Sequence, residues 1–495
     1  MKKLYLIFSD KLGTIAPEIY GHFTEHIGGV IYDGIWVGKN SPIPNVNGFR
    51  KYLIDKLKDI NPPVMRWPGG CFAETYDWRD GIGSDRPVRI NWWYSHDHRF
   101  EPNEVGTHEF IDFCRQIGAA PYFAANITSI TPLQVRDWID YCNSPEGTTT
   151  LAKEREENGH PEPFDIKYWG IGNENWGGGG NMTPTVYADE FRKYSTIANN
   201  TAPDLKIIAC GPNSTDYQWT QDCMEELKKS KKHLSGFSLH YYCGNAGDPV
   251  AFTQNEYYQQ LKQASAMEEI LVHHFNIIKG YGMGDYAKLV IDEWGCWHKN
   301  GSGPSKGYNL FEQQSTIRDG LVAALTLNIF NNHCDKILMA NVAQLVNNLH
   351  SLFLSSGENC IVTPTYHVFS MYKEHQGATA IKTIVEKDTI TYKGKDNNEA
   401  EIENLSVSSS YKDGFATITI ANLSATEAVE LDLEAVGAVL SEKATVTVLT
   451  NEDYHAHNTF EAPDTVLPIT ADTSISSGVM IPAAGVVSIR VALEK

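Results

Sequence analysis

Short apolar runs alternate with amphipathic segments from about residue 15 to residue 375. Apolar residues at helical spacing predict helices over 47–60 and 107–117, the second with Thr107 as its cap and Gly118 just past its end. Thr131-Pro132 and Thr183-Pro184 are typical of helix starts. The polar stretch 144–163 is predicted to be a rim loop. The apolar runs predict strands near Tyr20, at 64–67 and 121–126, before Glu174, and at 206–210, 236–240, 288–292 and 337–340.

This alternation predicts eight strand–helix units and therefore a parallel sheet. Eight units over this length favour a (β/α)8 TIM barrel, which belongs to the α/β class. A doubly wound open sheet is the alternative, but no GxGxxG follows the first strand. Active sites of barrels lie at the rim where the strands end. The polar residues at these ends are Glu25, Arg66, Asn126, Glu174, His240, Glu293 and Gln344.

The pattern changes near residue 376, where alternation of period two replaces helical spacing, as in 416–420, 429–433 and 487–491. Strands of this kind with turn residues between them predict a C-terminal all-β sandwich, jelly-roll-like in form. The strand-like run 4–8 precedes the barrel and is expected to join this sandwich. We therefore expect a catalytic barrel over 15–375 and a β-sandwich domain over 376–495, joined by the N-terminal strand 1–14.

Composition narrows the classes of partner and the compartment. The formal net charge of −20 argues against nucleic acid or an anionic membrane surface as a partner, and it suits a neutral glycan. Nine cysteines, an odd number without a CxxC pair, favour a reducing compartment over a disulfide framework. The N-terminus lacks the apolar core of a signal peptide, and no stretch approaches the roughly 20 apolar residues of a membrane span. We therefore expect a cytoplasmic protein.

Glu174 and Glu293 each end an apolar run close to a tryptophan, and they are 293 − 174 = 119 residues apart. This spacing corresponds to three strand–helix units and places them on the fourth and seventh strands. Paired carboxylates across a barrel mouth can hydrolyse a glycosidic bond, with retention at a separation of about 5–5.5 Å and inversion at about 6.5–9.5 Å. One of the two is expected to stay protonated near neutrality. Either residue alone could instead be a salt-bridged or capping side chain.

Six ordered motifs carry a resemblance to a known family: residues 20–26 (YGHFTEH), 66–72 (RWPGGCF), 172–174 (GNE), 240–242 (HYY), 292–294 (DEW) and 343–347 (AQLVN). With these motifs the chain resembles, along nearly its whole length, the α-L-arabinofuranosidases of glycoside hydrolase family 51, which are retaining (β/α)8 glycosidases. The resemblance implies that Glu174 is the acid/base and Glu293 the nucleophile. It also implies that Asn173 binds the hydroxyl next to the anomeric carbon, and that Tyr242 donates to Glu293.

The resemblance places further side chains around the sugar. Arg66 would lower the pKa of Glu293, His240 would lie close to Glu174, and Glu25 and Gln344 would hold the outer hydroxyls of the furanose ring. The alternatives are a core histidine, a structural ion pair, and, for Gln344 and Asn126, amides that only satisfy loop backbone. A metal site at Glu25 with the two flanking histidines does not fit helical ligand spacing, so we expect neither metal nor cofactor.

Three more residues are candidate substrate contacts. Cys71 stands where part of the family has asparagine, and because a thiol is a weaker donor its sugar contact is left open. Trp176 and Trp297 follow the catalytic positions by two and four residues. They are expected to stack on leaving-group sugars, with rim packing as the alternative.

The sequence thus predicts a retaining, exo-acting α-L-arabinofuranosidase that removes terminal arabinofuranosyl groups from arabinan or arabinoxylan oligosaccharides. Another retaining barrel glycosidase, such as a β-xylosidase or endoglucanase, is the nearest alternative. A non-catalytic glycan-binding protein is the alternative from a different class, and the intact glutamate pair argues against it. The family resemblance further implies a homo-oligomer, a hexamer in many members.

Overall fold

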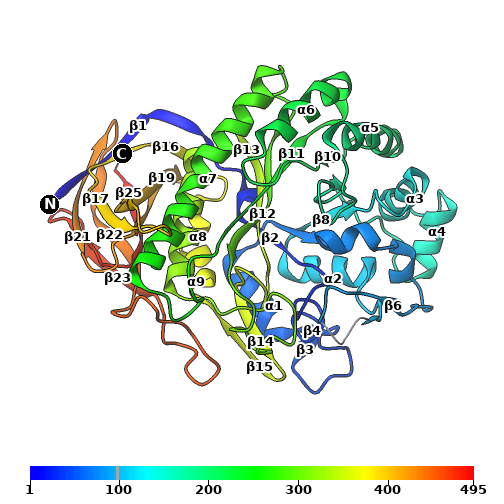
Figure 1. The fold of residues 1–495 in the computed structure, drawn as a ribbon, viewed down its shortest axis with the longest axis horizontal. Coiled ribbons are helices and arrows are strands. Elements are labelled where there is room, and N and C mark those ends of the chain that lie inside the picture. Colours follow the sequence, from blue (N-terminus) through cyan, green and yellow to red (C-terminus); the bar gives the residue numbers. More distant parts are fainter. Residues whose placement is uncertain (96–99, 495) are drawn as a thin grey trace.

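The computed structural model describes residues 1–95 and 100–494 (Figure 1). Within these residues eight parallel strands close a barrel, each hydrogen-bonded to the next and the last to the first. This confirms the predicted TIM barrel. In chain order the strands are β2 (Gly21–Phe23), β5 (Val64–Trp67), β8 (Ala120–Ala125), β9 (Tyr168–Ile171), β10 (Lys206–Ala209), β11 (Gly236–Gly244), β12 (Lys288–Trp297) and β13 (Ile337–Val342).

Helices follow the barrel strands along the chain and surround them, as the sequence predicts. The inside of the barrel is filled by a cluster of side chains from five strands, among them Val64, Tyr122 and Val290. The helices are α1 (Lys51–Ile60), α2 (Thr107–Ile117), α3 (Pro132–Asn143), α4 (Thr150–Glu157), α5 (Pro184–Thr201), α6 (Tyr217–Leu227), α7 (Gln254–Gly280), α8 (Ile317–Asn332) and α9 (Pro364–Tyr372).

One predicted helix start and one predicted cap are wrong, while the bounds predicted for α2, 107–117, are correct. The first helix begins at Lys51 rather than residue 47, because Asn47 and Gly48 have left-handed φ angles of 54° and 97° and form the turn of a small hairpin. The strands of this hairpin are β3 (Asn45–Val46) and β4 (Phe49–Arg50). The cap of α2 is Gly106 and not Thr107, whose hydroxyl instead accepts a hydrogen bond from Trp138 at 3.1 Å.

The other helix ends agree with the sequence. Thr131 and Thr183 cap α3 and α5, each followed by a proline in the first turn, and Gly118 ends α2 with φ at 77°. The predicted rim loop at 144–163 is wrong, because it contains α4. Arg155 from this helix is buried and donates to nearby backbone carbonyls, which allows a polar stretch to pack.

The C-terminal domain is all β, as predicted. In the described part of the chain, nine strands form one sheet whose apolar side chains share a single core, so the sheet folds over on itself. The N-terminal strand lies inside this sheet, antiparallel to β16 and parallel to β21. The sheet contains β1 (Lys2–Thr14), β16 (Thr379–Val385), β19 (Leu405–Lys412), β20 (Phe415–Asn422), β21 (Val429–Val436), β22 (Leu440–Leu449), β23 (Ile469–Ser474), β24 (Val479–Ile481) and β25 (Gly485–Leu493).

The two domains are joined along α8, which lies with α9 between the barrel and the sheet (Figure 1). Asn328 on α8 is buried and donates to the Ser406 carbonyl at 3.0 Å. Its amide oxygen accepts from the hydroxyls of Ser408 and Thr419 at 2.8 and 2.9 Å. Such a satisfied polar network specifies one relative position of the two domains.

The C-terminal domain also contains a hairpin of β17 (Thr389–Lys393) and β18 (Glu399–Glu403). Four further short strands lie in the described residues outside the barrel and the large sheet. They are β6 (Arg89–Ile90), β7 (Phe100–Glu101), β14 (Phe353–Ser356) and β15 (Asn359–Val362). Among the helices that the structure describes, none combines the length and the apolar character needed to cross a bilayer.

Candidate active site

A bulge in β12 presents two neighbouring acidic residues to the inside of the barrel. The register of β12 slips by one residue against both of its neighbours between Val290 and Trp294. An extra residue in a strand lets consecutive side chains escape the usual alternation of faces. Asp292 and Glu293 therefore both approach Arg66, whose Nε lies 3.9 Å from Asp292 and whose Nη1 lies 2.9 Å from Glu293.

Glu293 is surrounded by groups that favour its ionised form. Burial opposes ionisation, but His240 and Arg66, with a 2.8 Å hydrogen bond from the Tyr242 hydroxyl, outweigh it and hold the pKa of Glu293 below its ordinary value. Burial in turn raises the pKa of Tyr242, so this residue remains a donor. A buried, ionised and aimed carboxylate is what a nucleophile requires.

Glu174 follows β9 on a tight turn. Its own φ is 43°, an unusual left-handed value for a residue that is not glycine. Gly172 has φ at 86°, and a Cβ there would lie 2.1 Å from the Asn175 side chain. The turn closes through hydrogen bonds to the Glu174 carbonyl from Gly177 at 2.8 Å and Gly179 at 3.1 Å. The geometry of this turn fixes where the Glu174 side chain enters the site.

The two predicted catalytic glutamates meet in the folded chain. His240 Nδ1 lies 2.9 Å from Glu174 Oε1 and 3.5 Å from Glu293 Oε2. One carboxylate oxygen of each glutamate lies within 4.8 Å of the other. Glu174 keeps 20% of its side chain exposed against 8% for Glu293, so it faces the open side of the site.

Cys71 touches the acid/base candidate. Its thiol donates to Glu174 Oε2 at 3.4 Å. Burial, followed by the nearby Glu174 carboxylate, raises the pKa of Cys71, so the thiol stays neutral. The structure thus places Cys71 in the site through Glu174.

The remaining predicted sugar-binding residues converge on the same point. Asn173 Oδ1 accepts from Arg66 Nη2 at 2.6 Å. A Cβ on Gly70 would lie 2.8 Å from Glu293, 3.4 Å from Asn173 and 3.4 Å from Glu25, which shows how closely these three side chains surround the glycine.

Glu25 and Gln344 form a pair at this point. Gln344 Nε2 donates to Glu25 Oε2 at 2.8 Å, and the Phe72 backbone donates to the other oxygen at 3.1 Å. Burial, followed by the charge of Glu293, raises the pKa of Glu25 to about 7. The flanking histidines bind elsewhere, since His26 bonds to Glu101 and Trp67 while His22 packs on Phe369.

The last three predicted substrate contacts are Asn126, Trp176 and Trp297, and each has different neighbours. Asn126 bonds to Thr128 and Ser129 of its own loop and donates to the Tyr76 carbonyl of a neighbouring loop, which agrees with the alternative of an amide that satisfies backbone. Trp176 is half-buried against the core. Trp297 is 41% exposed and packs edge-to-face on Tyr242, with ring centroids 5.2 Å apart.

Sequence reasoning missed Glu74, which is buried below the site. Its carboxylate accepts hydrogen bonds from two rim loops, through the backbone of Asn173 at 2.7 Å and Ile127 at 2.9 Å, and through the side chain of Asn175 at 2.9 Å. Burial raises its pKa while these hydrogen bonds oppose the rise. The available signal was an acid that directly follows the apolar residues Phe72 and Ala73.

Asp292 was also not assigned a role. It accepts a hydrogen bond from the hydroxyl of Tyr122 at 3.0 Å and lies beside Arg66. Asp292 therefore helps to position the guanidinium of Arg66, which in turn binds Glu293. Burial raises the pKa of Asp292, opposed first by the Arg66 charge. Its position directly before Glu293 suggested an outward side chain, and only the bulge brings it inside.

Two clusters of described residues have ligand atoms close enough to hold a metal ion. The first is the Glu174, His240 and Glu293 set. The second contains Cys296, His298 and Asp319, where His298 bonds to Asp319 at 2.8 Å and Asp319 also caps α8. In each cluster the histidine already pairs with a carboxylate. The absence of a metal and of a cofactor stays a prediction.

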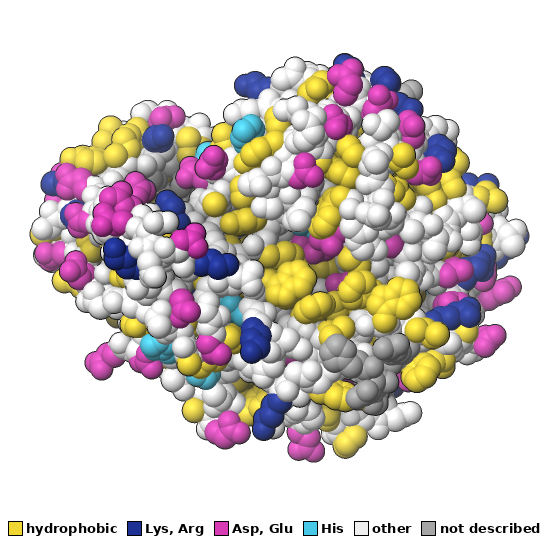
Figure 2. Space-filling view, viewed as in Figure 1, with side chains coloured by type: hydrophobic (Ala, Val, Ile, Leu, Met, Phe, Trp, Pro, Cys, Tyr) yellow, Lys and Arg dark blue, Asp and Glu magenta, His cyan; other side chains and the backbone are white. Residues whose placement is uncertain are grey.

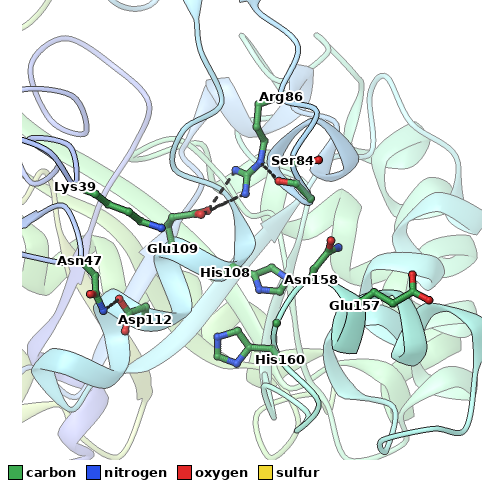
Figure 3. Close-up of a pocket in the computed structure, with 12 residues that line it drawn as sticks. Lys39, Asn47, Ser84, Arg86, His108, Glu109, Asp112, Glu157, Asn158 and His160 are labelled. Carbon is green, nitrogen blue, oxygen red and sulfur yellow. Dashed lines mark hydrogen bonds and ion pairs between the residues drawn. The ribbon is translucent and has the colours of Figure 1, made fainter.

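The structure contains two large cavities, and only one of them adjoins a catalytic glutamate. One of about 910 Å³ is lined by Tyr242 and Trp297 and so adjoins Glu293. Another of about 750 Å³ lies at α2 and α4, where Arg86 pairs with Glu109 beside His108 (Figure 3). None of the predicted site residues lines this second hollow, so it has no part in the site.

Comparison with known proteins agrees with this geometry. The family model "Alpha-L-arabinofuranosidase C-terminal domain" matches residues 292–484, and "Alpha-L-arabinofuranosidase 1 domain" matches residues 56–263. An "Intracellular exo-alpha-L-arabinofuranosidase" of Bacteroides ovatus is 38% identical over 98% of this chain and 94% of its own length.

Solved structures give the same result. The crystal structure of the GH51 arabinofuranosidase from Xanthomonas axonopodis pv. citri superposes with a TM-score of 0.91 at 34% identity, covering 99% of this chain and 100% of that one. The α-L-arabinofuranosidase from Thermotoga maritima, an arabinose complex, gives 0.87 at 30% identity with the same coverage. The chain therefore belongs to the α-L-arabinofuranosidases of glycoside hydrolase family 51.

Proposed function

We propose that the protein removes terminal α-L-arabinofuranosyl groups from arabinan or arabinoxylan oligosaccharides by a retaining double displacement. The observation that carries this mechanism is the approach of the Glu174 and Glu293 carboxylates to within 4.8 Å. Retaining glycosidases hold their carboxyl groups about 5–5.5 Å apart, whereas inverting ones need about 6.5–9.5 Å to admit a water.

The surroundings of each glutamate support distinct roles. Glu293, ionised between Arg66 and the Tyr242 hydroxyl, attacks the anomeric carbon and forms the glycosyl-enzyme. Glu174, more exposed and in contact with Cys71, protonates the departing oxygen. In the second half-reaction Glu174 takes a proton from the water that opens the intermediate.

The sugar is held by the residues that surround Gly70. Arg66 donates to both Asn173 and Glu293, so Asn173 lies close to the nucleophile, where it can bind a hydroxyl next to the anomeric carbon. Gln344 keeps its amide oxygen buried and unpaired among the described residues, so it can accept from an outer hydroxyl while its nitrogen holds Glu25. Because these residues enclose the sugar on the side away from the cleaved bond, only a terminal sugar fits, and this gives exo action.

A chromogenic α-L-arabinofuranoside assayed with the wild type, Glu174→Ala and Glu293→Ala tests the assignment. We expect turnover by the wild type and a loss of about 10³-fold or more in Glu293→Ala. In Glu174→Ala we expect partial recovery by azide, an anionic nucleophile that attacks the glycosyl-enzyme without a base and releases the arabinosyl azide while Glu293 is freed. Hydrolysis followed by NMR should show the α-anomer of arabinose first, and the β-anomer would contradict retention.

The same assay separates the alternatives. Turnover of a β-xyloside alone would identify a different barrel glycosidase, and turnover of neither substrate would identify a glycan-binding protein. A cytoplasmic location and assembly into a homo-hexamer also belong to the proposal. The first is supported by the relative named intracellular, and the second rests on the family resemblance.

A further inference from the structure

The C-terminal domain forms part of the wall of the 910 Å³ cavity that Tyr242 links to Glu293. Tyr242, which donates to Glu293, marks the end of the cavity nearest the reaction. Lys395, in the turn between β17 and β18, lines the same cavity although it lies about a hundred residues beyond the catalytic strand. Residues from both domains therefore surround any group that leaves the site on this side.

The hairpin β17–β18 is held firmly against the barrel. Tyr392 is 7% exposed and packs on Tyr258 of α7, with ring centroids 5.7 Å apart. The backbone of Lys393 donates to Asn255 at the start of α7 at 3.1 Å. The hairpin turn is closed by a hydrogen bond from Gly394 to the Asn398 carbonyl at 2.9 Å, so Lys395 is carried on an anchored turn.

The C-terminal domain also supports a second wall of the cavity. Asn245, in the loop between β11 and α7, lines the cavity, and Phe252 lies in the same loop. His455 of the C-terminal domain bonds to the Phe252 carbonyl at 2.7 Å, and the Tyr454 ring lies 6.0 Å from that of Phe252. Two separate segments of this domain thus shape the cavity.

The lining chemistry fits sugar hydroxyls. Trp297 offers an exposed aromatic face on which a sugar ring can stack, and Asn245 and Gln263 offer amides. Among the lining residues that the structure describes none is a carboxylate, whereas Lys299 and Lys395 are cationic donors, in a chain of net charge −20. In Figure 2, basic side chains lie between the lobe of the C-terminal domain and the hydrophobic side chains near the middle of this face.

We propose that this cavity is the leaving-group subsite for the sugar residues beyond the cleaved bond, and that Lys395 of the C-terminal domain determines the preference for oligosaccharides. The inference rests on the proposed function, since it assigns the part of the substrate that Glu174 protonates. The domain then contributes directly to substrate selection.

The test compares a linear arabinotriose with 4-nitrophenyl α-L-arabinofuranoside, whose leaving group is short and needs no added sugar contacts. We expect Lys395→Ala to lower kcat/KM for the arabinotriose by about 10-fold or more, the size of a lost hydrogen bond from a charged group. The value for the nitrophenyl substrate should stay within about 2-fold. Lys393→Ala, an exposed lysine on the same hairpin that does not line the cavity, is the matched control and should change neither value.

The outcomes separate this inference from the proposed function. If the wild type hydrolyses both substrates and Lys395→Ala lowers both equally or lowers neither, the subsite assignment is wrong while the activity stands. If the wild type hydrolyses no arabinofuranoside, the proposed function itself fails. A second variant, with 394–398 replaced by a two-residue turn, should reproduce the selective loss, and its thermal unfolding shows that the domain is still folded.

Discussion

At the scale of single residues, His240 connects the charges of the two catalytic glutamates. Burial lowers its pKa, but Glu293 and Glu174 outweigh burial and leave the pKa of His240 above its ordinary value. A protonated imidazole 3.5 Å from Glu293 favours the ionised nucleophile, and His240 leads the groups that lower the pKa of Glu293. The histidine therefore extends activity toward acidic pH.

His240→Gln should move the acidic limb of the pH profile of kcat/KM to higher pH. The nucleophile must be ionised, its pKa lies below its ordinary value, and loss of the neighbouring cation raises that pKa. Activity near pH 4 should therefore fall more than activity near pH 6. His333→Gln, which changes a partly exposed histidine paired with Glu268, is the control. An unmoved acidic limb would show that His240 does not set the charge of Glu293.

At the scale of elements, the strands were predictable and their junctions were not. The predicted runs 64–67 and 206–210 agree with β5 and β10 to within a residue, because buried parallel strands are continuously apolar. The same pattern could not reveal the bulge that turns Asp292 inward, since a bulge depends on register against two neighbouring strands. The helix α4 was missed because its stretch is polar and gains its core from one buried arginine, Arg155.

The site residues show the same difference between what a sequence pattern reveals and what only the fold reveals. Glu174 and Glu293 could be found because each ends an apolar run of the sequence, and barrel topology brings the residues at and just beyond these runs together. Glu74 could not, because its role is to receive hydrogen bonds from the loops after β8 and β9, which approach it only in the folded chain. For Asn126 the position at a strand end favoured a sugar contact, which stays a prediction, while its amide also bonds to nearby loops.

Glu74→Gln should impair proton donation by Glu174 more than nucleophilic attack. An amide would set its own N–H groups against the donors of Asn173 or Ile127 and shift the turn that carries the acid/base. We expect kcat/KM for an alkyl or sugar leaving group to fall about 10-fold further than for a dinitrophenyl one, which needs no protonation. Thermal unfolding measured in parallel reports the cost to stability. An equal loss for both leaving groups would assign Glu74 a purely structural role.

At the scale of the whole molecule, we expect the barrel and the sheet to fold as one unit. The strand β1 starts the chain, yet it lies between β16 and β21 of the C-terminal sheet, so the sheet is complete only when both ends of the chain are in place. The buried α8 joins this sheet to the barrel through Asn328. The segments that hold the leaving-group cavity, around Lys395 and His455, belong to the same sheet domain.

Leu6→Ala should therefore weaken the whole enzyme. Leu6 is fully buried in the core of the C-terminal sheet, and loss of such a side chain costs about 2–5 kcal/mol of the free energy of unfolding. Because polar contacts along α8 couple the domains, urea should unfold both in one transition, with arabinofuranosidase activity lost at the same urea concentration as the β-sheet signal. Asp10→Ala, at an exposed position on the same strand, should leave the transition in place. Two separate transitions, with activity surviving the first, would show that the barrel folds and works without its C-terminal partner, and that the domains are joined only by the chain.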